Sequence, residues 1–310
     1  HNPATPNQRP VSAAAATAAA ATAAAAAPVP DRPKAAAVAA ASRGHARPIR
    51  FLTWNARTLS GVKLLALDSL LHDNSVDVAV VTETELQHGD IPAMRGFEVH
   101  LPSIQASARV RMALYVKSSL LAEPLALGDA AVDLPVAAVS LPGGHVVVGV
   151  YRQFALTGTA EKGMHFQWQQ LFALTRLLQQ LEDRPGVRSL TLLGDFNLDM
   201  ARSSDSTYSH RSLLAKWLET VAQLGLHWAP TGHTYTSDGK HKDGQRYKST
   251  LDHVYHSSSD CMSSARVLPD ATTDHYPVQV DVQLERTRRA ATRVTRTERD
   301  FRGLDKDALV

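Results

Sequence analysis

Between residues 48 and 284 the chain alternates short apolar segments with longer amphipathic ones, and this alternation limits the possible folds more than any other feature. Segments such as IRFLTWN (49–55) and RSLTLLGD (188–195) have the length and composition of buried strands. The segment VKLLALDSLLHD (62–73) repeats leucine at helical spacing, as a helix does when it packs on a sheet. The pattern predicts one α/β domain with a substantial sheet.

The same criteria apply along the rest of this region. Further strands are predicted at 76–83, 111–116, 145–152, 250–257 and 275–284, and helices at about 163–182 and 211–225. On the two later helices, aromatic and leucine residues at helical spacing are predicted to pack against a sheet; they are Trp168, Phe172, Leu213, Leu214 and Trp217.

The two ends of the chain differ from this middle part. Residues 1–47 consist mainly of Ala, Pro, Thr and Ser and are predicted to be a disordered leader, too weakly apolar to span a bilayer. Residues 286–302 hold seven arginines against two acidic residues, so 285–310 is predicted to be an Arg-rich tail or linker, either phosphate-binding or simply solvated. Cys261 is the only cysteine, which excludes an internal disulfide and a cysteine-based zinc site.

Polar residues recur at or just past the ends of the apolar strands. In chain order they are Asn55, Glu83, Tyr151, Asp195 with Asn197, Asp252, and Asp274 with His275. Any one of them could simply close a strand by making a turn. Two strands, however, run from apolar residues into a carboxylate, at Glu83 and at Asp195. Two such charges near one end of a sheet repel each other unless a cation lies between them.

A hard divalent cation meets that need. Mg²⁺ prefers oxygen ligands and usually takes one or two protein carboxylates, with a substrate phosphate completing its shell, so Mg²⁺ is the predicted cofactor and Mn²⁺ the alternative. Zinc is less favoured, because the 14 histidines show no H-x-x-x-H or H-E-x-x-H spacing beside the carboxylates. Glu83 beside Asn55 or Asn197 could hold the ion for phosphate ester chemistry. His275 could supply a proton or stabilise a transition state if a carboxylate such as Asp252 keeps it oriented.

Six short motifs occur in order along this part of the chain. They are TWN (53–55), TET (82–84), VY (150–151), GDFN (194–197), LDHV (251–254) and TDHYPV (273–278). Together they resemble the ordered motifs of the endonuclease/exonuclease/phosphatase superfamily, and the similarity spans residues 49–284. The resemblance implies a four-layer α/β sandwich, in which two mixed β-sheets pack face to face with helices on the outside, as in DNase I-like folds. It also implies a Mg²⁺-dependent phosphodiesterase or phosphatase site at one rim of the sandwich, in a domain covering residues 48–284.

The resemblance assigns the metal-binding side of the site by position. Glu83 would be the principal metal ligand, with Asn55 beside it, and Asp274 would lie close to the metal or its water.

The catalytic side is assigned in the same way. Asp195 would polarise the attacking water, and Asn197 would hold that water or a phosphate oxygen. Tyr151 would hydrogen-bond the phosphate. His275, oriented by Asp252, would act on the phosphoryl oxygen.

One branch of the superfamily is the most similar. TWNARTL (53–59), VVTETEL (80–86), TYTS (234–237) and STLDHV (249–254) resemble variants found in the endonuclease domain of non-LTR retrotransposons. Such a domain nicks one DNA strand so that a reverse transcriptase can prime from the new 3′-hydroxyl. The resemblance implies DNA as a partner, a reverse transcriptase domain encoded downstream in the same polyprotein, and a nuclear location. The leader, the tail and the lack of an initiating Met agree with a piece of a longer polyprotein.

A nuclease must also hold a polyanion, whereas residues 51–284 are mildly acidic, with 19 Lys and Arg against 24 Asp and Glu. Four basic side chains in KHKDGQRYK (240–248) could reverse the charge locally; they are Lys240, Lys242, Arg246 and Lys248. This segment is predicted to be a loop beside Asp252 that contacts phosphates, with a solvated hairpin tip as the alternative. Two other classes of function stay open: a phosphatase or a small-molecule or lipid phosphodiesterase of the same fold, and a catalytically inactive binding module.

Overall fold

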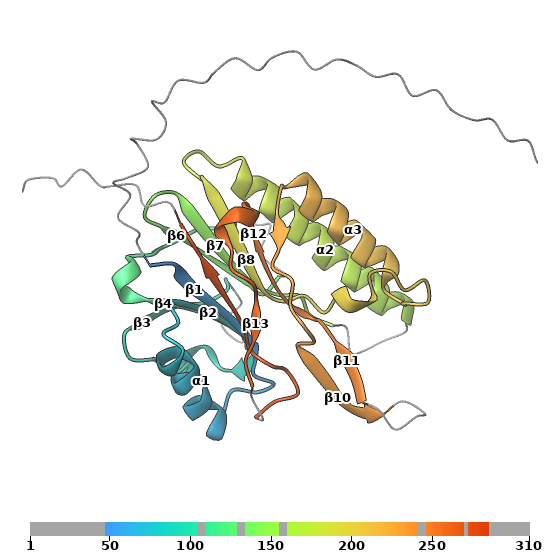
Figure 1. The fold of residues 1–310 in the computed structure, drawn as a ribbon, viewed down its shortest axis with the longest axis horizontal. Coiled ribbons are helices and arrows are strands. Elements are labelled where there is room, and N and C mark those ends of the chain that lie inside the picture. The colour runs from blue at the N-terminus through green and yellow to red at the C-terminus, as the bar shows by residue number, and fades with distance from the viewer. Residues whose placement is uncertain are drawn as a thin grey trace, which may run out of the picture. The chain divides into compact units, whose positions relative to one another are not determined.

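The computed structural model describes residues 47–103, 109–128, 134–154, 160–240, 246–269 and 272–284. The predicted leader and tail therefore lie outside the described residues, except for Arg47. Within the described part, two six-stranded sheets and a separate two-stranded one account for the strands (Figure 1). No helix in the described part is both long enough and apolar enough to cross a membrane.

The first sheet is built mainly from the N-terminal half of the domain and closed by late strands. Its strands, in spatial order, are β13 (Arg266–Val267), β14 (Val278–Val282), β1 (Ile49–Asn55), β2 (Val78–Leu86), β4 (Val110–Lys117) and β3 (Phe97–His100). Only β1 and β2 are parallel; the other neighbours pair antiparallel. The first sheet is thus mixed, and the carboxyl ends of β1 and β2 lie at the same edge.

The second sheet repeats this arrangement with later segments. Its strands, in spatial order, are β5 (Glu123–Pro124), β6 (Val136–Leu141), β7 (His145–Tyr151), β8 (Ser189–Asp195), β12 (Asp252–His256) and β9 (His227–Trp228). Here β7 and β8 are the parallel pair, and the other neighbours are antiparallel. The two-stranded sheet is the hairpin of β10 (Tyr235–Lys240) and β11 (Arg246–Ser249).

Three α-helices cover the outer faces of the two sheets (Figure 1). They are α1 (Val62–Asp73), which lies against the first sheet, and α2 (Ala160–Glu182) and α3 (Arg211–Gln223), which lie side by side against the second. The order helix, sheet, sheet, helix confirms the predicted four-layer sandwich.

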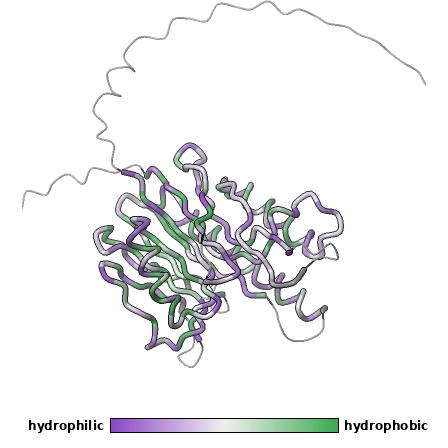
Figure 2. The backbone as a smooth tube through the Cα atoms, turned by 60° about the horizontal axis from the view of Figure 1, so that its bottom comes forward, coloured by the Kyte–Doolittle hydropathy of each residue, from purple (hydrophilic) through white to green (hydrophobic). Residues whose placement is uncertain are grey.

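Each of the three boundaries between layers has its own apolar core. Leu67 and Leu71 of α1 pack with Trp54 and Val81 of the first sheet. On the opposite side of the molecule, α2 and α3 pack on the outer face of the second sheet through residues such as Trp217. Figure 2 shows the hydrophobic residues gathered along the strands that these layers enclose.

The two sheets pack closely against each other. Phe51 and Val80 of the first sheet pack there against Val147 and Leu193 of the second. At Gly149 on β7, a Cβ atom would lie 2.7 Å from Cγ2 of Val80, so only glycine allows this separation of the sheets. The alternation of small and branched residues along these strands therefore sets how closely the two halves of the sandwich approach each other.

The predicted elements are confirmed with small differences at their ends. The helix predicted at 62–73 has those bounds, whereas the strand predicted at 76–83 runs from Val78 to Leu86. The strand predicted at 275–284 begins only at Val278, because Pro277 before it has no N–H to donate to a ladder. The segment predicted as a loop at 240–248 instead includes the end of β10 and most of β11.

One core assignment was wrong. Trp217, Leu213 and Leu214 are buried as predicted, and Trp168 packs partly against the core below α2. Phe172 is instead 53% exposed and stacks on Trp168, with 5.4 Å between ring centroids. Four residues apart on a helix, the two rings reach each other along the surface, so helical spacing alone did not tell a core contact from a surface pair.

Candidate active site

The sandwich brings the polar strand ends together at one edge. Because β1 is parallel to β2 and β7 is parallel to β8, Asn55, Tyr151 and Asp195 lie where their strands end. Glu83 lies within β2, one residue past the partner of Asn55. The strand β12 runs antiparallel to β8, so its first residue, Asp252, is the register partner of Asp195. The topology thus explains why residues up to 200 positions apart in the sequence are neighbours.

The GDFN motif forms a strained turn directly after β8. Gly194 has φ +149°, and a Cβ atom there would lie 1.8 Å from the carbonyl oxygen of Val150, so no other residue fits. Asn197 also has a positive φ, +49°. Its backbone N–H donates to Oδ1 of Asp195 at 2.9 Å, and its side-chain Nδ2 donates to the carbonyl oxygen of Arg152 at 2.8 Å. The side chain of Asn197 is therefore fixed by the backbone of Arg152, the residue directly after β7.

Asp195 is fully buried and held on both oxygens. Its Oδ2 accepts a 2.8 Å hydrogen bond from Nδ2 of Asn55, while Oδ1 accepts the N–H of Asn197. Asn55, also fully buried, is fixed in turn because its Oδ1 accepts from the backbone N–H of Arg57 at 2.9 Å. A carboxylate oxygen can accept two hydrogen bonds, so Asp195 keeps capacity for a further donor.

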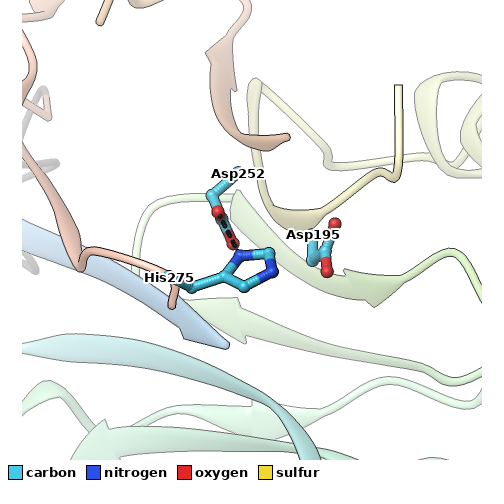
Figure 3. A group of neighbouring side chains, drawn as sticks. All are labelled: Asp195, Asp252 and His275. Carbon is cyan, nitrogen blue, oxygen red and sulfur yellow. Dashed lines mark hydrogen bonds and ion pairs between the residues drawn. The ribbon is translucent and has the colours of Figure 1, made fainter. Parts of the chain in front are cut away.

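His275 and Asp252 form a hydrogen-bonded pair beside Asp195. Nδ1 of His275 lies 2.9 Å from Oδ2 of Asp252. Figure 3 shows the imidazole between the two carboxylates, with its second ring nitrogen on the side of Asp195. The bond at Nδ1 fixes the orientation of the ring and leaves Nε2 as the nitrogen directed toward Asp195.

Glu83 reaches the site through an irregularity in β2. Pairing between β2 and β4 shifts register between Thr82 and Leu86, and both Glu83 and Glu85 have positive φ values, 49° and 56°. Such a bulge turns a side chain away from its regular face. The phenolic hydroxyl of Tyr151 donates to Oε1 of Glu83 at 3.0 Å, which ties Glu83 to the end of β7.

The side-chain hydrogen bonds that join these pairs cross from one sheet to the other. Asn55 of the first sheet donates to Asp195 of the second, and Tyr151 of the second donates to Glu83 of the first. His275, on the segment that leads into β14 of the first sheet, bonds Asp252 of the second. The site is therefore a seam between the two sheets.

The electrostatics of this seam follow from its buried carboxylates. Burial and the neighbouring Asp252 carboxylate raise the pKa of Asp195 to about 7, against the partial opposition of His275 and two hydrogen bonds. Burial alone would lower the pKa of His275, but the carboxylates of Asp252, Asp195 and Asp274 outweigh it and raise that pKa to about 9. The raised pKa of His275, and part of the rise for Asp195, come from neighbouring carboxylates, whose negative charge would stabilise a cation.

Asp274 meets a partner that the sequence did not suggest. Its Oδ2 accepts from Nη1 of Arg57 at 2.7 Å, while its Oδ1 is buried without a hydrogen bond. Arg57 has φ +43° and lies in the loop between β1 and α1. Nothing in the sequence distinguished it from a solvated loop arginine, since its contact lies 217 residues away.

A cleft of about 550 Å³ opens beside this ion pair. Its lining includes the basic residues Arg57, Lys63 and Arg246 together with Asp274. Of the four predicted substrate-binding residues, Arg246 thus lines a cleft, and Lys248 follows it on β11, exposed. Lys242 and the side chain of Lys240 lie outside the described residues.

A second arginine that the sequence analysis missed is Arg152, directly after Tyr151. It is fully buried, and its guanidinium donates to backbone carbonyls of the GDFN turn. A basic residue at a strand end normally reads as solvated, and only the fold shows that it faces inward.

The oxygen atoms at the seam are suited to a hard divalent cation. Asp252 and Asp274 each have a buried Oδ1 without a hydrogen bond, and Glu83 adds a third carboxylate at the edge. Among the described residues, Asp195, Asp252 and His275 are a group that could itself hold a metal. In that group, His275 and Asp195 already share hydrogen bonds with Asp252, Asn55 and Asn197.

A two-sheet sandwich with an acidic, amide- and histidine-containing seam at the ends of its parallel strands defines a DNase I-like fold. The family model described as the Endonuclease/Exonuclease/phosphatase family matches residues 52–275, and the chain belongs to that family. The match spans the seam from Asn55 to His275. A comparison with curated proteins finds no match.

Solved structures with the same fold include nucleases and a phosphatase. A 3′ phosphatase, NExo, from Neisseria, bound to a product DNA hairpin, is 22% identical with a TM-score of 0.60, covering 76% of this chain and all of its own. The endonuclease domain of TRAS1, a telomere-specific non-LTR retrotransposon, is 19% identical with a TM-score of 0.54, covering 77% and 100%. The AP endonuclease LMAP from Leishmania major is 17% identical with a TM-score of 0.58, covering 77% and 89%. At these identities the likeness shows the fold alone.

Proposed function

We propose that this protein is a Mg²⁺-dependent endonuclease that nicks one strand of DNA. The observation that carries the proposal is the buried seam in which Asp195, held by Asn55 and Asn197, lies beside the His275–Asp252 pair. A base, a fixed amide and an oriented imidazole around one point are the groups that phosphodiester hydrolysis needs.

Glu83, Asn55 and Asp274 would hold the ion. All three offer oxygen, the ligand that Mg²⁺ prefers, and Mn²⁺ takes similar ligands. When bound, the ion would stabilise negative charge on the phosphoryl oxygens of the substrate.

Asp195 acts as the base toward the attacking water. Its raised pKa keeps it able to accept a proton near neutral pH, and the hydrogen bonds from Asn55 and Asn197 fix both its oxygens in place. The Asn197 amide holds that water or a phosphate oxygen. Water attacks phosphorus, its proton passes to Asp195, and the bond from phosphorus to the 3′ oxygen breaks, that oxygen taking a proton from solvent to become the 3′-hydroxyl.

His275 and Tyr151 act on the phosphate itself. The imidazolium of His275, kept charged and oriented by Asp252, donates a hydrogen bond to a phosphoryl oxygen from Nε2. The hydroxyl of Tyr151 donates to Glu83 in the free protein and would donate to phosphate once substrate is bound. Hydrogen-bond donors from both halves of the sandwich would thus stabilise negative charge on the phosphoryl oxygens.

DNA would lie across the basic cleft. Arg57, Lys63 and Arg246 line it next to Asp274, and Lys248 continues the basic surface along β11, with Lys240 and Lys242 as further proposed contacts. These residues would contact backbone phosphates, which offsets the mildly acidic middle of the chain.

The retrotransposon setting belongs to this proposal. The motif resemblance and the shared fold with the TRAS1 endonuclease domain support a domain that nicks a target for a reverse transcriptase in the same polyprotein. The genomic sequence downstream of Val310 tests this directly: an open reading frame with reverse transcriptase motifs supports it, and an unrelated reading frame or a stop contradicts it.

Residues 48–284 would then be the catalytic domain, with 1–47 and 285–310 outside it. Limited proteolysis followed by mass spectrometry should yield a stable core with ends near these positions. A core that keeps either end would contradict the boundaries.

The nuclease is tested with supercoiled plasmid. Wild-type protein with Mg²⁺ should convert supercoiled DNA to the nicked circle. Asp195→Asn should not, and Glu83→Gln should do so only at a raised Mg²⁺ concentration. Release of phosphate from a DNA 3′-phosphate without nicking would favour a phosphatase, the activity of the Neisseria structure with the same fold. Binding of DNA without any hydrolysis would favour an inactive binding module.

A further inference from the structure

Arg152, directly after β7, is the largest charged side chain among the fully buried described residues. Its side chain is fully buried, and among the described residues no carboxylate forms an ion pair with it. Burial lowers the pKa of its guanidinium to about 10, with partial opposition from the Asp195 charge. Burying an unpaired cation is unfavourable unless hydrogen bonds replace the lost water.

Each donor group of that guanidinium has a defined acceptor. Nε donates to the carbonyl oxygen of Phe196 at 2.5 Å, and Nη2 donates to the carbonyl oxygen of Asn197 at 2.8 Å. Nη1 donates to Oε1 of Gln167, a buried residue on α2. Two of the three contacts are therefore made to consecutive carbonyls of the GDFN turn.

The backbone of Arg152 binds the same turn. Its N–H donates to the carbonyl oxygen of Asp195 at 2.9 Å, and its carbonyl oxygen accepts from Nδ2 of Asn197 at 2.8 Å. One residue thus contacts Asp195, Phe196 and Asn197 in succession. Arg152 therefore binds, through both its backbone and its side chain, the turn that carries the two proposed catalytic side chains.

The turn needs such support because its own conformation is unfavourable. A positive φ in a non-glycine residue such as Asn197 persists only when surrounding contacts impose it. The turn directs the carbonyl groups of Phe196 and Asn197 toward Arg152, in the interior, where they require hydrogen-bond donors. The planar fork of an arginine satisfies two neighbouring carbonyls at once, which a lysine ammonium on a flexible stem cannot do with the same geometry.

We propose that Arg152, held by Gln167, is a positioning residue that sets the geometry of Asp195 and Asn197 in the reaction. The inference rests on the proposed function for its kinetic readout. Gln167 contributes by accepting from Arg152 through Oε1 while its Nε2 donates to the carbonyl oxygen of Gln153 at 2.8 Å, so α2 fixes the angle of the guanidinium.

The helix α2 offers a matched control. Gln170, one turn after Gln167, is also buried, but neither atom of its amide has a hydrogen-bond partner. Replacing either glutamine by methionine removes a buried amide of the same size from the same helix. Only Gln167→Met removes a contact to Arg152.

Plasmid nicking rates measured against DNA concentration test the proposal. Gln167→Met should lower kcat about 10-fold with KM within about twofold of wild type, because a displaced turn misplaces reacting groups without altering DNA binding. Gln167→Glu, which keeps the acceptor, should restore kcat to within about threefold of wild type, and Gln170→Met should leave it there. Equal losses in Gln167→Met and Gln170→Met, or no loss in Gln167→Met, would overturn the proposal.

Arg152→Lys and Arg152→Met, if they fold, should lose kcat about 100-fold and to a similar extent, because charge without the fork does not hold two carbonyls. Retained activity in Arg152→Lys contradicts the geometric argument.

Hydrogen exchange separates this inference from the nuclease proposal. In Gln167→Met, backbone amides of residues 195–200 should exchange faster than in wild type and in Gln170→Met, whether or not the protein cleaves DNA. Unchanged exchange in this segment would overturn the positioning role. A wild-type protein that is inactive on DNA but shows the exchange difference would overturn only the proposed function.

Discussion

Asp195 and Asp252 occupy the same rung of one sheet, as register partners on β8 and β12, yet their carboxylates have different partners. Asp195 accepts from two amide groups, whereas Asp252 accepts from the imidazole of His275 and keeps its Oδ1 without a hydrogen bond. In the proposed reaction, these two register partners would have separate roles, Asp195 toward the attacking water and Asp252 toward His275.

Replacing Asp252 by Asn should lower kcat for DNA nicking by about 100-fold, because a neutral amide no longer keeps His275 charged and oriented. Steady-state kinetics on plasmid DNA measure the effect. The control is Asp260→Asn, an acidic residue exposed in the short 3₁₀ helix Ser259–Cys261, which should retain wild-type rates. Wild-type rates in Asp252→Asn would exclude a role for the pair.

Activity should require a divalent ion, and Glu83→Gln should raise the Mg²⁺ concentration for half-maximal nicking by at least about 10-fold. A titration of Mg²⁺ after treatment with a chelator measures this. Glu85→Gln is the matched control, because Glu85 lies in the same bulge with a positive φ but pairs with Arg111 and Arg109. Full activity after chelation, or equal shifts in both variants, would argue against Glu83 as a ligand.

Gly194→Ala should lower the free energy of unfolding by about 3 kcal/mol, since it combines a disfavoured φ with a Cβ 1.8 Å from the carbonyl of Val150. Urea denaturation followed by fluorescence measures the change. Gly232→Ala, where a Cβ meets nothing within 4 Å, should change it by less than about 0.5 kcal/mol. A stable Gly194→Ala protein would mean that the turn can relax.

The stability of the fold should fall in mild acid because of His256. This histidine is buried at the far end of β12 from Asp252, and burial lowers its pKa from 6.5 to about 4. A histidine that is neutral in the folded state stabilises it fully above its unfolded pKa and loses that contribution as the pH falls toward 4. The free energy of unfolding should therefore decline between pH 6.5 and 4 by roughly 1 kcal/mol per pH unit from this group.

Substitution isolates that contribution. In His256→Gln the decline with falling pH should be shallower, whereas the exposed His72→Gln should reproduce the wild-type slope. Denaturant unfolding at several pH values provides the slopes. Parallel curves for His256→Gln and wild type would assign the acid sensitivity to other groups.

DNA binding should depend less steeply on salt in Arg246→Ala than in wild type, with the slope of log K against log salt reduced by about 1. Arg246 lines the cleft beside Asp274, so its charge should release one counterion on binding. Arg188→Ala removes an equal, exposed charge at the opposite end of β8 from Asp195 and should leave the slope unchanged. Equal slopes in both variants would place the DNA elsewhere.

The sequence carried enough to locate the edge at which the site forms. Polar residues that interrupt apolar strands stand out locally, so Asn55, Asp195 and Asp252 could be selected before any pairing was known. The family resemblance carried by the ordered motifs then implied the sandwich, which the structure has.

What the sequence did not reveal depends on contacts between distant residues. Burial of Arg152 is decided by carbonyls 44 and 45 positions later, and the ion pair of Arg57 by a residue 217 positions away. The bulge that turns Glu83 is likewise a property of the pairing between β2 and β4, which the hydrophobic periodicity of the sequence does not reveal. Short strands such as β5, which has two residues, are too short to show a period at all.

Because the candidate site lies between the two sheets, neither half of the sandwich contains all of its residues. Asn55 and Glu83 belong to one sheet, His275 to the segment that leads into β14 of that sheet, and Tyr151, Asp195 and Asp252 to the other sheet. A slip of one sheet across its partner would therefore separate all three bonded pairs together. The rate of DNA nicking should consequently depend on the packing of the two halves. It should fall at denaturant concentrations where each sheet still keeps its own backbone hydrogen bonds.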